Sequence, residues 1–405
     1  MKRSLFLLVV MLAVGSVALN SATRAKMVNP KRELRVITLE GSPYNRGLVH
    51  GQTLKSEINE LVRLWKADLE KDYKMNADAF VAKFLKQTDY TKAIKKWTPE
   101  LLEEVRGIAD GSGVDFDTIY AFQLVDEMWA NGEAIATEHC TSIGVNKRGD
   151  SPTLVAQNMD IPLFYHGYQT LLQIKHSGSD LESFVLTTPG LIALNGMNNS
   201  AVAINCNTLT QLRPAREGLP VAFIVRGVLE RRSLEEAEQF IRGINHASGQ
   251  NYIIGGAEKA KSLECSAGKV TEYRPYPGAD RTYHTNHPLA NDDFNPRYVE
   301  GLKKNNKTLL EGAYYCYRFE SVEKRLRDRT KVVDVSAIKE TLSSRDWEGE
   351  KGKGLISNAS TYACVIMVLS ETPTLHIAPG NPHLTAFQTF TFFAQAKTAR
   401  KDARK

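Results

Sequence analysis

Cysteine is scarce in this sequence and its spacing is irregular. The five cysteines show no paired spacing and no metal-binding motif; they lie at positions 140, 206, 265, 316 and 364. Because the count is odd, at least one thiol stays outside any disulfide, and the sequence assigns no pairing to the others. His284 and His287 are close in sequence, but no third ligand is linked to them by a motif. The sequence therefore predicts no metal site and no cofactor.

A large excess of charge of one sign is also missing. The chain has 52 lysines and arginines against 46 aspartates and glutamates, which gives a formal net charge of +6 at pH 7. The basic stretch 397–405 is typical of a solvated chain end rather than of a binding element. Nucleic acid is therefore not an expected partner.

Long hydrophobic runs are absent beyond the first 25 residues. The run 5–14 follows a Lys-Arg pair and precedes small residues, which is the pattern of a secretory signal peptide cut after Ala18 or Ala25. This run is shorter than the roughly 18 residues that a spanning helix needs, so a membrane anchor is the less favoured alternative. We expect residues 1–25 to be a signal peptide, the mature protein to be secreted or periplasmic, and no segment to span a membrane.

Internal repeats and low-complexity linkers are absent as well, and the chain divides by its secondary-structure signals. Before position 140, apolar residues recur at helical spacing; after it, short strands alternate with turns and a few helices, which favours a layered architecture. Ser233 with Glu236 three residues on is a capping box that opens one helix. The expected helices are 99–109, 116–130, 218–230, 234–243 and a mixed helical segment at 312–342. The expected strands are 141–145, 153–160, 202–209, 251–255, 261–265, 269–274, 361–369, 373–377 and 385–393.

A cysteine stands at the entrance of the first strand after the helical part. Cys140 precedes the strand 141–145, and turn residues 146–150 connect this strand to 153–160. A nucleophile of the papain type would instead open a helix, and its sequence signature is absent. One interpretation is a half-buried structural cysteine, since cysteine is among the most buried residue types. The other is a cysteine that becomes a new N-terminus when the His139–Cys140 bond is cleaved.

An N-terminal cysteine would carry its own base. The pKa of a free α-amine is about 8 and that of a cysteine thiol is about 8.5, so the amine can accept the thiol proton. Before cleavage, the same thiol could attack the preceding carbonyl, move the chain onto sulfur and release it by hydrolysis. Processing and catalysis would then use one residue.

Several short motifs follow one another along nearly the whole mature chain. Each motif alone is weak, but their order and spacing are together fairly specific. They are Leu39–Gly47 with His50-Gly51, Ile108–Val114, Gln157–Asp160, Asn205–Leu209, Thr285-Asn286-His287 and Ala378–Pro382. In this combination the sequence resembles the acyl-coenzyme A:6-aminopenicillanic acid acyltransferase family, the C45 peptidases of the N-terminal-nucleophile (Ntn) hydrolase superfamily.

The resemblance implies a fold and a division of the chain. The fold is α+β, a four-layer αββα sandwich in which two antiparallel sheets face each other between helical layers. The divisions are the signal peptide 1–25, a helical pro-region 26–139 that becomes the α chain, and a catalytic domain 140–405 that becomes the β chain. The cleaved pro-region is then expected to remain as a heterodimer partner.

The resemblance also implies catalytic partners for Cys140. Asp160 is expected to hydrogen-bond the new α-ammonium group or to orient the substrate, with a turn aspartate as the alternative; Met159 stands where the family usually has an aromatic residue. Asn286 matches the family's oxyanion position, where a prearranged donor lowers the barrier by about 3–4 kcal/mol. Asn207 is expected to supply a second polar contact, although asparagines near turns are usually structural.

The sequence departs from the family in one segment. Several members carry an Ile-Cys-Arg segment whose arginine lies at the active site, and the corresponding stretch here reads Ile356-Ser357-Asn358. That guanidinium is expected to be missing, and the nearby Arg345 aligns with a different region. Because the fork of an arginine suits carboxylate groups, the departure affects the expected substrate more than the nucleophile.

The sequence therefore predicts a self-processing N-terminal cysteine amidohydrolase or acyltransferase that cleaves an N-acyl amide through a thioester on Cys140. Export would separate it from cytosolic acyl-CoA, which favours hydrolysis over CoA-dependent transfer. Two alternatives stay open. One is a catalytically degenerate secreted binding protein that retains the fold, suggested by Asn358 in place of the arginine. The other is a secreted thiol protease of another fold, which the strand after Cys140 disfavours.

Overall fold

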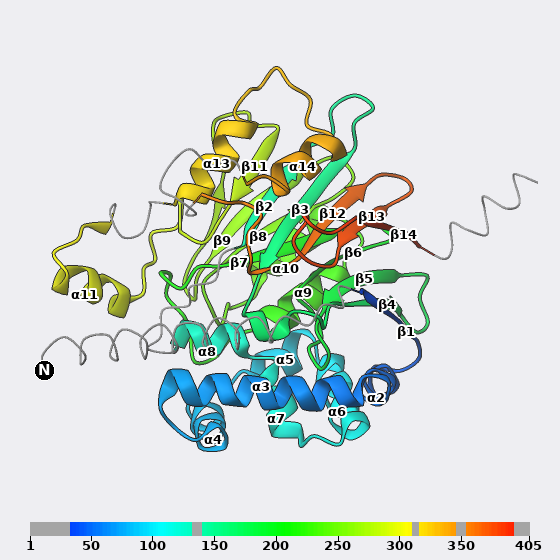
Figure 1. Cartoon of the computed structure of the whole chain (residues 1–405), viewed down its shortest axis with the longest axis vertical. Helices are drawn as coiled ribbons and strands as arrows, with labels where there is room; N and C mark the ends of the chain where they lie inside the picture. The colour runs from blue at the N-terminus through cyan, green and yellow to red at the C-terminus, as the bar shows by residue number, and fades with distance from the viewer. Residues whose placement is uncertain (1–32, 132–139, 310–315, 346–353, 393–405) are drawn as a thin grey trace, which may run out of the picture.

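Two β-sheets form the centre of the molecule (Figure 1). The computed structural model describes residues 33–131, 140–309, 316–345 and 354–392. The larger sheet has eight strands in the order β1-β4-β5-β6-β7-β8-β9-β10. They are β1 (Arg35–Leu39), β4 (Thr170–Lys175), β5 (Glu182–Thr187), β6 (Asn195–Asn198), β7 (Ala203–Thr208), β8 (Gln250–Gly255), β9 (Ala260–Cys265) and β10 (Val270–Tyr273).

The second sheet has six strands in the order β11-β2-β3-β12-β13-β14, and all of its pairings are antiparallel. The strands are β2 (Thr141–Val145), β3 (Thr153–Asp160), β11 (Arg281–His284), β12 (Thr361–Leu369), β13 (Thr374–Ala378) and β14 (Gln388–Thr391). Every residue of β3 is buried, because this strand has neighbours on both sides and is covered on both faces.

Helices cover the outer face of each sheet. Helices α9 (Val221–Leu229) and α10 (Leu234–Gly243) contact β6, β7 and β8 of the larger sheet. Helices α13 (Tyr317–Leu326) and α14 (Val335–Leu342) contact β11, β3 and β12 of the smaller sheet, while β2 and β3 contact β7, β8 and β9 across the interface between the sheets. The predicted αββα sandwich is confirmed, with two apolar cores on either side of the smaller sheet.

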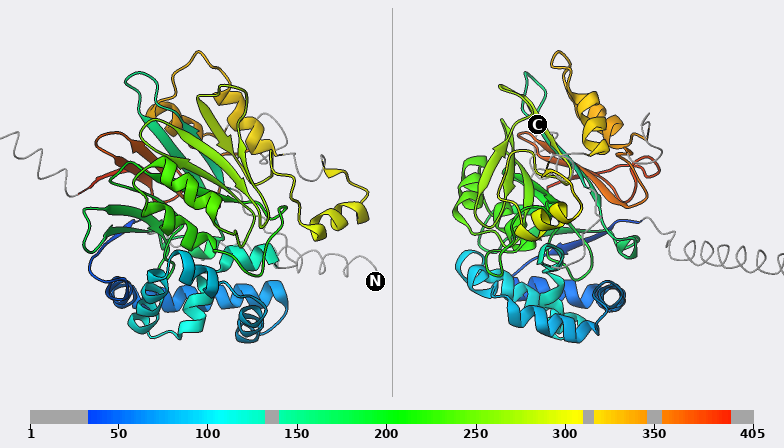
Figure 2. Two further views of the ribbon diagram at one scale, coloured as in Figure 1. Left: turned by 180° about the vertical axis from the view of Figure 1, so that it is seen from behind. Right: turned by 90° about the vertical axis from the view of Figure 1, so that its left-hand side faces the viewer.

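The helices that precede Cys140 gather at one end of the sandwich, as the blue and cyan ribbons of Figures 1 and 2 show. A single core cluster unites their buried residues with those of the larger sheet, so this part packs as part of the same body. Short helix η1 (Leu163–Tyr165) and helix α11 (Pro296–Lys304) lie outside this group. The group consists of α2 (Pro43–Thr53), α3 (Lys55–Tyr73), α4 (Ala77–Gln87), α5 (Thr91–Trp97), α6 (Glu100–Ser112), α7 (Phe116–Phe122) and α8 (Val125–Asn131).

Helices α2 and α6 approach each other through glycines. A Cβ atom at Gly47 would lie 1.9 Å from the carbonyl oxygen of Glu104, and one at Gly107 would lie 2.2 Å from the carbonyl oxygen of Tyr44. Only glycine therefore allows this backbone contact. The contact explains Gly47, Gly51 and Gly111 of the sequence motifs, and it brings Arg46 of α2 next to Glu104 of α6.

Two expectations for this part of the chain need correction. The segment before Cys140 is not purely helical, since β1 pairs in parallel with β4 at the edge of the larger sheet. The expected helix 116–130 is interrupted between α7 and α8. At that point Gln123 and Leu124 donate to carbonyls three residues back, and the Gln123 side chain bonds the loop at Gly190. Tertiary hydrogen bonds thus end the helix where periodicity alone would continue it.

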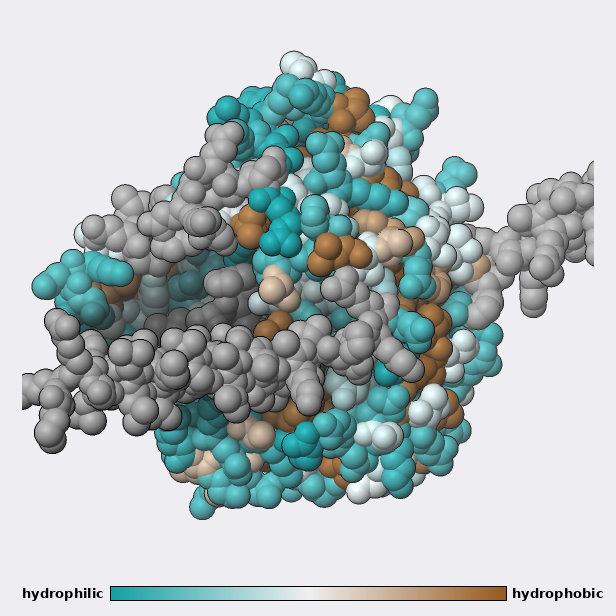
Figure 3. Space-filling model, in the orientation of Figure 1, coloured by the Kyte–Doolittle hydropathy of each residue, from teal (hydrophilic) through white to brown (hydrophobic). Residues whose placement is uncertain are grey.

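Other local predictions agree well with the structure. Helix α10 begins as expected, because the Ser233 side chain accepts a hydrogen bond from the backbone N–H of Glu236. Strand β12 has the expected bounds. Within the described ranges, no helix is both long and apolar enough to cross a bilayer; the apolar run 5–14 lies outside them. The described surface visible in Figure 3 is mainly hydrophilic, with hydrophobic residues in small groups.

Candidate active site

The ends of three neighbouring strands bring Cys140, Asp160 and Asn286 together. Strand β2 lies between β11 and β3, with His284 opposite Ser142 and Thr141 opposite Asn158. If the pairing of β11 with β2 is continued by two residues, Asn286 lies opposite Cys140. If the pairing of β2 with β3 is continued by one residue, Met159 lies opposite Cys140, and Asp160 is the next residue of β3. Residues far apart in sequence thus converge because β2, β3 and β11 end at the same edge of the sheet.

The Cys140 side chain lines a cavity of about 50 Å³. It is buried, and its Sγ lies 3.6 Å from Sδ of Met159 and 3.8 Å from the carbonyl oxygen of Asp160. Asn286 lines the same cavity. The remaining wall is mostly apolar; it includes Val125, Trp129, Ile161, Tyr165, Leu191, Leu194 and Val221. A thiol and an amide side chain therefore face one apolar pocket.

A buried arginine that the sequence did not single out binds both residues. Arg318 of α13 donates from Nη1 to the carbonyl oxygen of Cys140 at 2.6 Å and to Thr141 Oγ1 at 3.0 Å. Its Nη2 donates to Asn286 Oδ1 at 3.1 Å. The structure thus supplies a guanidinium from α13, whereas Asn358 stands in the segment 356–358, as the sequence indicated. Arg345, the nearby arginine considered in its place, is exposed.

These contacts fix the orientation of the Asn286 amide. Arg318 can only donate, so it bonds the Oδ1 atom, and the carbonyl oxygen of Thr208 can only accept, so it takes a hydrogen bond from Nδ2 at 3.1 Å. One N–H of Nδ2 is used in this bond. The second N–H is therefore available as a donor, which is the geometry that an oxyanion site requires.

Asp160 is buried beside this arrangement. Burial raises the pKa of its carboxyl group to about 7, against the lowering influence of Arg318 and Asn358. Its Oδ2 accepts a 2.6 Å hydrogen bond from Asn358 Nδ2, whereas its buried Oδ1 has no hydrogen-bond partner. Asn358, which stands where the family has an arginine, therefore contacts the carboxylate as a neutral donor. This leaves one carboxylate oxygen of Asp160 available to a further donor.

Asn207, like Asp160, is a predicted site residue that the structure does not place on the cavity wall. The wall includes its neighbours Cys206 and Thr208. Asn207 is fully buried, its Oδ1 accepts a hydrogen bond from Asn251 at 3.3 Å, and its Nδ2 has no hydrogen-bond partner. A role for Asn207 in the reaction stays a prediction.

A second thiol lies close enough to Arg318 to be affected by its charge. Cys316 precedes α13 and accepts a hydrogen bond from Thr285 Oγ1 at 3.3 Å. Burial raises the pKa of the Cys316 thiol, but Arg318, His287 and Thr285 outweigh that effect and lower it to about 6. Arg318 thus lowers the pKa of the Cys316 thiol and also donates a hydrogen bond to the Cys140 carbonyl oxygen.

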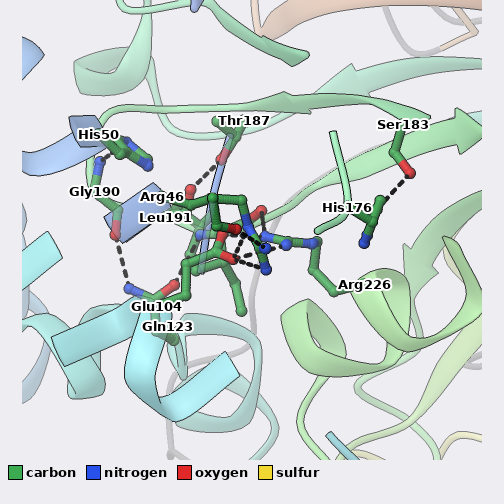
Figure 4. A network of polar contacts seen from close by, with 12 residues as sticks. Arg46, His50, Glu104, Gln123, His176, Ser183, Thr187, Gly190, Leu191 and Arg226 are labelled. Carbon is green, nitrogen blue, oxygen red and sulfur yellow. Dashed lines mark hydrogen bonds and ion pairs between the residues drawn. The ribbon is translucent and has the colours of Figure 1, made fainter. Parts of the chain in front are cut away.

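A buried ionic network holds the loop that forms part of the cavity wall (Figure 4). Glu104 pairs with Arg46 at 2.9 Å and also with Arg226 of α9, and all three side chains are almost fully buried. Burial alone would raise the pKa of Glu104, but Arg226 and Arg46 lower it to about 2. Helices α2, α6 and α9 are therefore tied together by a fully charged cluster.

The same region fixes the loop by neutral hydrogen bonds. Gln123 bonds the carbonyl of Gly190 at 2.8 Å and accepts from the N–H of Ile192 at 2.9 Å. The N–H of Gly190 donates to Nε2 of His50, whose pKa burial lowers to about 4 and which is therefore neutral. Leu191, between these two anchored residues, lines the cavity. The part of the chain before Cys140 thus shapes the pocket.

The five cysteines all lie in the described ranges, and no disulfide joins any of them. In the same ranges no group of three or more His, Cys, Asp and Glu side chains could hold a metal ion. His284 instead bonds Glu264 at 2.7 Å, and Glu264 also accepts from the backbone N–H groups of Leu289, Ala290 and Asn291. His284 therefore forms a hydrogen bond with the same carboxylate that holds the backbone at 289–291, shortly after Asn286.

Comparison with known proteins gives a family and several relatives. The sequence model of the family "Acyl-coenzyme A:6-aminopenicillanic acid acyl-transferase" matches residues 146–347, about half of the chain. The matched range contains Asp160, Asn207, Asn286 and Arg318, and it begins just after Cys140. The acyl-coenzyme A:6-aminopenicillanic-acid-acyltransferase 40 kDa form of Emericella nidulans is 28% identical over 63% of this chain and 70% of its own length. Protein dcd1A of Dictyostelium discoideum is 32% identical over 28% of this chain and 30% of its own length.

Solved structures with similar architecture include an N-acylethanolamine-hydrolyzing acid amidase ortholog from Caenorhabditis elegans. It is 16% identical with a TM-score of 0.41, and the match covers 62% of this chain and 100% of that one. A mutant conjugated bile acid hydrolase from Clostridium perfringens is 14% identical with a TM-score of 0.40, over 62% and 97% of the two chains. On the sequence match and the order of its motifs, the chain belongs to the acyl-coenzyme A:6-aminopenicillanic acid acyl-transferase family.

Proposed function

We propose that the chain is a self-processing N-terminal-nucleophile enzyme that cleaves N-acyl amides through a thioester on Cys140. The observation that carries the proposal is the set of hydrogen bonds from Arg318, which joins the Cys140 carbonyl to the Asn286 side chain at one apolar cavity. Asn286 lines the same cavity as Cys140 and would hold the oxyanion that forms there. Membership of an acyl-transferase family supports the same chemistry.

Processing begins with the Cys140 thiol as nucleophile. Sγ attacks the carbonyl carbon of the preceding peptide bond, the C–N bond breaks, and the acyl chain passes to sulfur as a thioester while the nitrogen becomes an amine. Water then hydrolyses the thioester, which releases the preceding chain as a carboxylate and regenerates the thiol. His139 supplies the attacked carbonyl and lies outside the described residues.

Turnover uses the new α-amine as the base. The amine takes the thiol proton, and the thiolate attacks the substrate amide carbonyl to give a tetrahedral oxyanion that the free N–H of Asn286 stabilises. The ammonium group then returns its proton to the departing amine. Water attacks the remaining thioester, and the acid is released; an amine acceptor in place of water would give acyl transfer instead.

Asp160 is placed to bind the positively charged α-ammonium group that cleavage would create at Cys140. Its Oδ1 is buried without a partner, and burial raises the pKa of the group to about 7. In the uncleaved chain the nitrogen of Cys140 is a neutral amide. An α-ammonium group formed next to Asp160 would stabilise the carboxylate and thereby hold the amine in place for proton transfer.

The cavity favours an apolar acyl group. Most of its wall consists of aliphatic and aromatic side chains. Together with the N-terminal signal pattern, which separates the protein from cytosolic acyl-CoA, this supports hydrolysis of an N-acyl amide outside the cytosol. The cleaved segment would remain bound, since its residues help to form the cavity.

Intact-mass analysis of the purified protein tests the proposal. The wild-type protein should consist of two chains that divide between His139 and Cys140, and Cys140→Ala should remain a single chain without turnover. Cys206→Ala is the matched control, because this thiol also lies on the cavity wall and should leave cleavage unchanged. An uncleaved wild-type chain that still turns over amides would contradict the mechanism.

A processed protein that hydrolyses no member of a broad acyl-amide panel would instead support the alternative of a binding protein. The panel should vary the length of the acyl chain and the charge of the amine. Electrophilic trapping followed by peptide mapping should place the acyl group on Cys140. A label on another cysteine would exclude the assigned nucleophile.

A further inference from the structure

An acidic side chain from the segment before Cys140 lies on the wall of the catalytic cavity. Asp126 of α8 lines this cavity together with Cys140 and Asn286, and it remains partly exposed to the cavity. Its helical neighbours on the wall are apolar, namely Val125 and Trp129. A charge in such a wall is unusual, because removing a carboxylate from water is costly unless it gains a partner.

Neutral groups hold one oxygen of this carboxylate. Oδ1 accepts hydrogen bonds from Thr208 Oγ1 at 2.7 Å and from Gln250 Nε2 at 3.1 Å. Throughout the described ranges, no lysine, arginine or histidine forms an ion pair with Asp126. These donors fix the orientation of the side chain. They leave its charge without a counter-ion.

The adjacent Glu127 is fully buried and does not line the cavity. Its Oε1 accepts from the N–H of Val221 at 3.1 Å and from Ser248 at 2.9 Å. Burial and the neighbouring Asp126 raise the pKa of Glu127 to about 8, and burial also raises the pKa of Asp126. Burial thus favours the neutral form of Glu127, and Asp126 is the member of the pair that lines the cavity.

Asp126 is also linked to the oxyanion donor. Thr208 donates its hydroxyl to Asp126, and its carbonyl oxygen accepts the Nδ2 hydrogen bond of Asn286. The carboxylate is thus linked through Thr208, by two hydrogen bonds, to Asn286, the proposed oxyanion donor. A substrate group that extends from the scissile carbonyl into the cavity would reach Asp126.

We propose that Asp126 is a specificity residue that binds a cationic ammonium group on the substrate, placed a short distance from the scissile amide. This inference rests on the proposed amide cleavage at Cys140. It adds a charge preference to an otherwise apolar site, and it makes the segment before Cys140 a direct contributor to substrate selection after processing.

The test compares paired substrates that differ only in charge. Each pair is an N-acyl amide with a terminal ammonium group and its analogue with a hydroxyl group, and one series carries this group on the amine side while the other carries it on the acyl side. Asp126→Asn keeps an oxygen that can accept from Thr208 and Gln250 but removes the charge. We expect kcat/KM for the ammonium member of one series to fall by about ten- to a hundredfold, with the hydroxyl member nearly unchanged.

Glu127→Gln is the matched control. It removes an ionisable group from the next position of the same helix but keeps an acceptor for Val221 and Ser248, so the ratio between ammonium and hydroxyl substrates should not change. An equal loss on both members of each pair in Asp126→Asn would show that Asp126 only supports the structure, and it would overturn the inference.

Binding to uncleaved Cys140→Ala protein gives a readout that does not depend on turnover. Calorimetry with n-butylammonium and with n-butanol should show tighter binding of the cation, and the Asp126→Asn exchange in this background should abolish that difference. Equal binding of both probes by Cys140→Ala protein would overturn the inference even if amide cleavage is confirmed. Preferential binding of the cation without any turnover in wild-type protein would instead contradict the proposed catalysis alone.

Discussion

At the scale of single residues, Arg318 is the group on which the site depends. It reaches the Cys140 carbonyl, the Asn286 side chain and, through its charge, the Cys316 thiol. No motif in the sequence marks it. Its position in a helix beyond the smaller sheet matters only because α13 packs against β11, the strand that leads to Asn286.

The first residue-scale prediction concerns Asn286. Asn286→Ala should lower kcat by roughly a hundredfold or more, because the tetrahedral oxyanion loses a prearranged donor. The comparison must use processed protein, verified by intact mass, since self-cleavage also passes through an oxyanion and is expected to slow. Near wild-type turnover of processed Asn286→Ala would show that the donor lies elsewhere.

The second residue-scale prediction separates the charge of Arg318 from its shape. In the wild-type protein the Cys316 thiolate should dominate above about pH 6, so its alkylation rate should rise through that pH. Arg318→Met removes the cation that stabilises the thiolate, so the pKa of Cys316 should increase and the alkylation profile should move to higher pH. Turnover should fall as well, because Asn286 loses the donor that orients its amide.

Arg318→Lys provides the contrast. A lysine keeps the positive charge but not the planar fork, so the Cys316 profile should stay near that of the wild type while kcat falls. Arg327→Met, at the end of the same helix, should change neither measurement. If Arg318→Lys and Arg318→Met behave alike in the alkylation profile, the charge of Arg318 is not the cause of the low Cys316 pKa.

At the scale of secondary-structure elements, the contact between α2 and α6 decides how the helices before Cys140 reach the pocket. Their backbones meet at glycines, and this close approach lets Arg46 join Glu104 and Arg226 in the buried cluster. A side chain at the crossing would separate the helices. The loop that contains Leu191 would then lose part of its support.

The element-scale prediction follows from this geometry. Gly107→Ala places a Cβ atom 2.2 Å from the backbone oxygen of Tyr44, so the helices must move apart at a cost of about 1–3 kcal/mol or more. Urea unfolding of Cys140→Ala protein, which stays a single chain, measures the effect. Gly301→Ala is the control: this glycine lies in α11 with open space around it, so the exchange should be neutral or slightly stabilising.

At the scale of the whole molecule, the two parts on either side of Cys140 form one body. Strand β1 completes the edge of the larger sheet, and one apolar core cluster includes residues from both parts. We therefore predict that the two chains stay associated after cleavage. They should co-elute in gel filtration at the volume of uncleaved Cys140→Ala protein and should separate only in denaturant, with loss of turnover. Separation in buffer with retained activity would contradict this prediction.

The sequence by itself determined the local features of this protein. Alternating and helical periodicities gave the order of most elements, the capping box at Ser233 marked the start of α10, and the turn before β3 marked the hairpin after Cys140. Asp160 and Asn286 were predicted because their short motifs resemble those of the family, and their roles stay predictions. These features depend on neighbours along the chain, so a pattern of a few residues is sufficient to predict them.

Only the tertiary structure decided which distant groups meet. The placement of Arg318 beside Asn286, the contact of Asn358 with Asp160 and the position of Asp126 on the cavity wall all depend on how helices pack on sheets. The interruption of the helix at Gln123 and the parallel pairing of β1 with β4 have the same origin. Burial and long-range hydrogen bonds override local propensity in such cases, because their free energies exceed the small differences between local conformations.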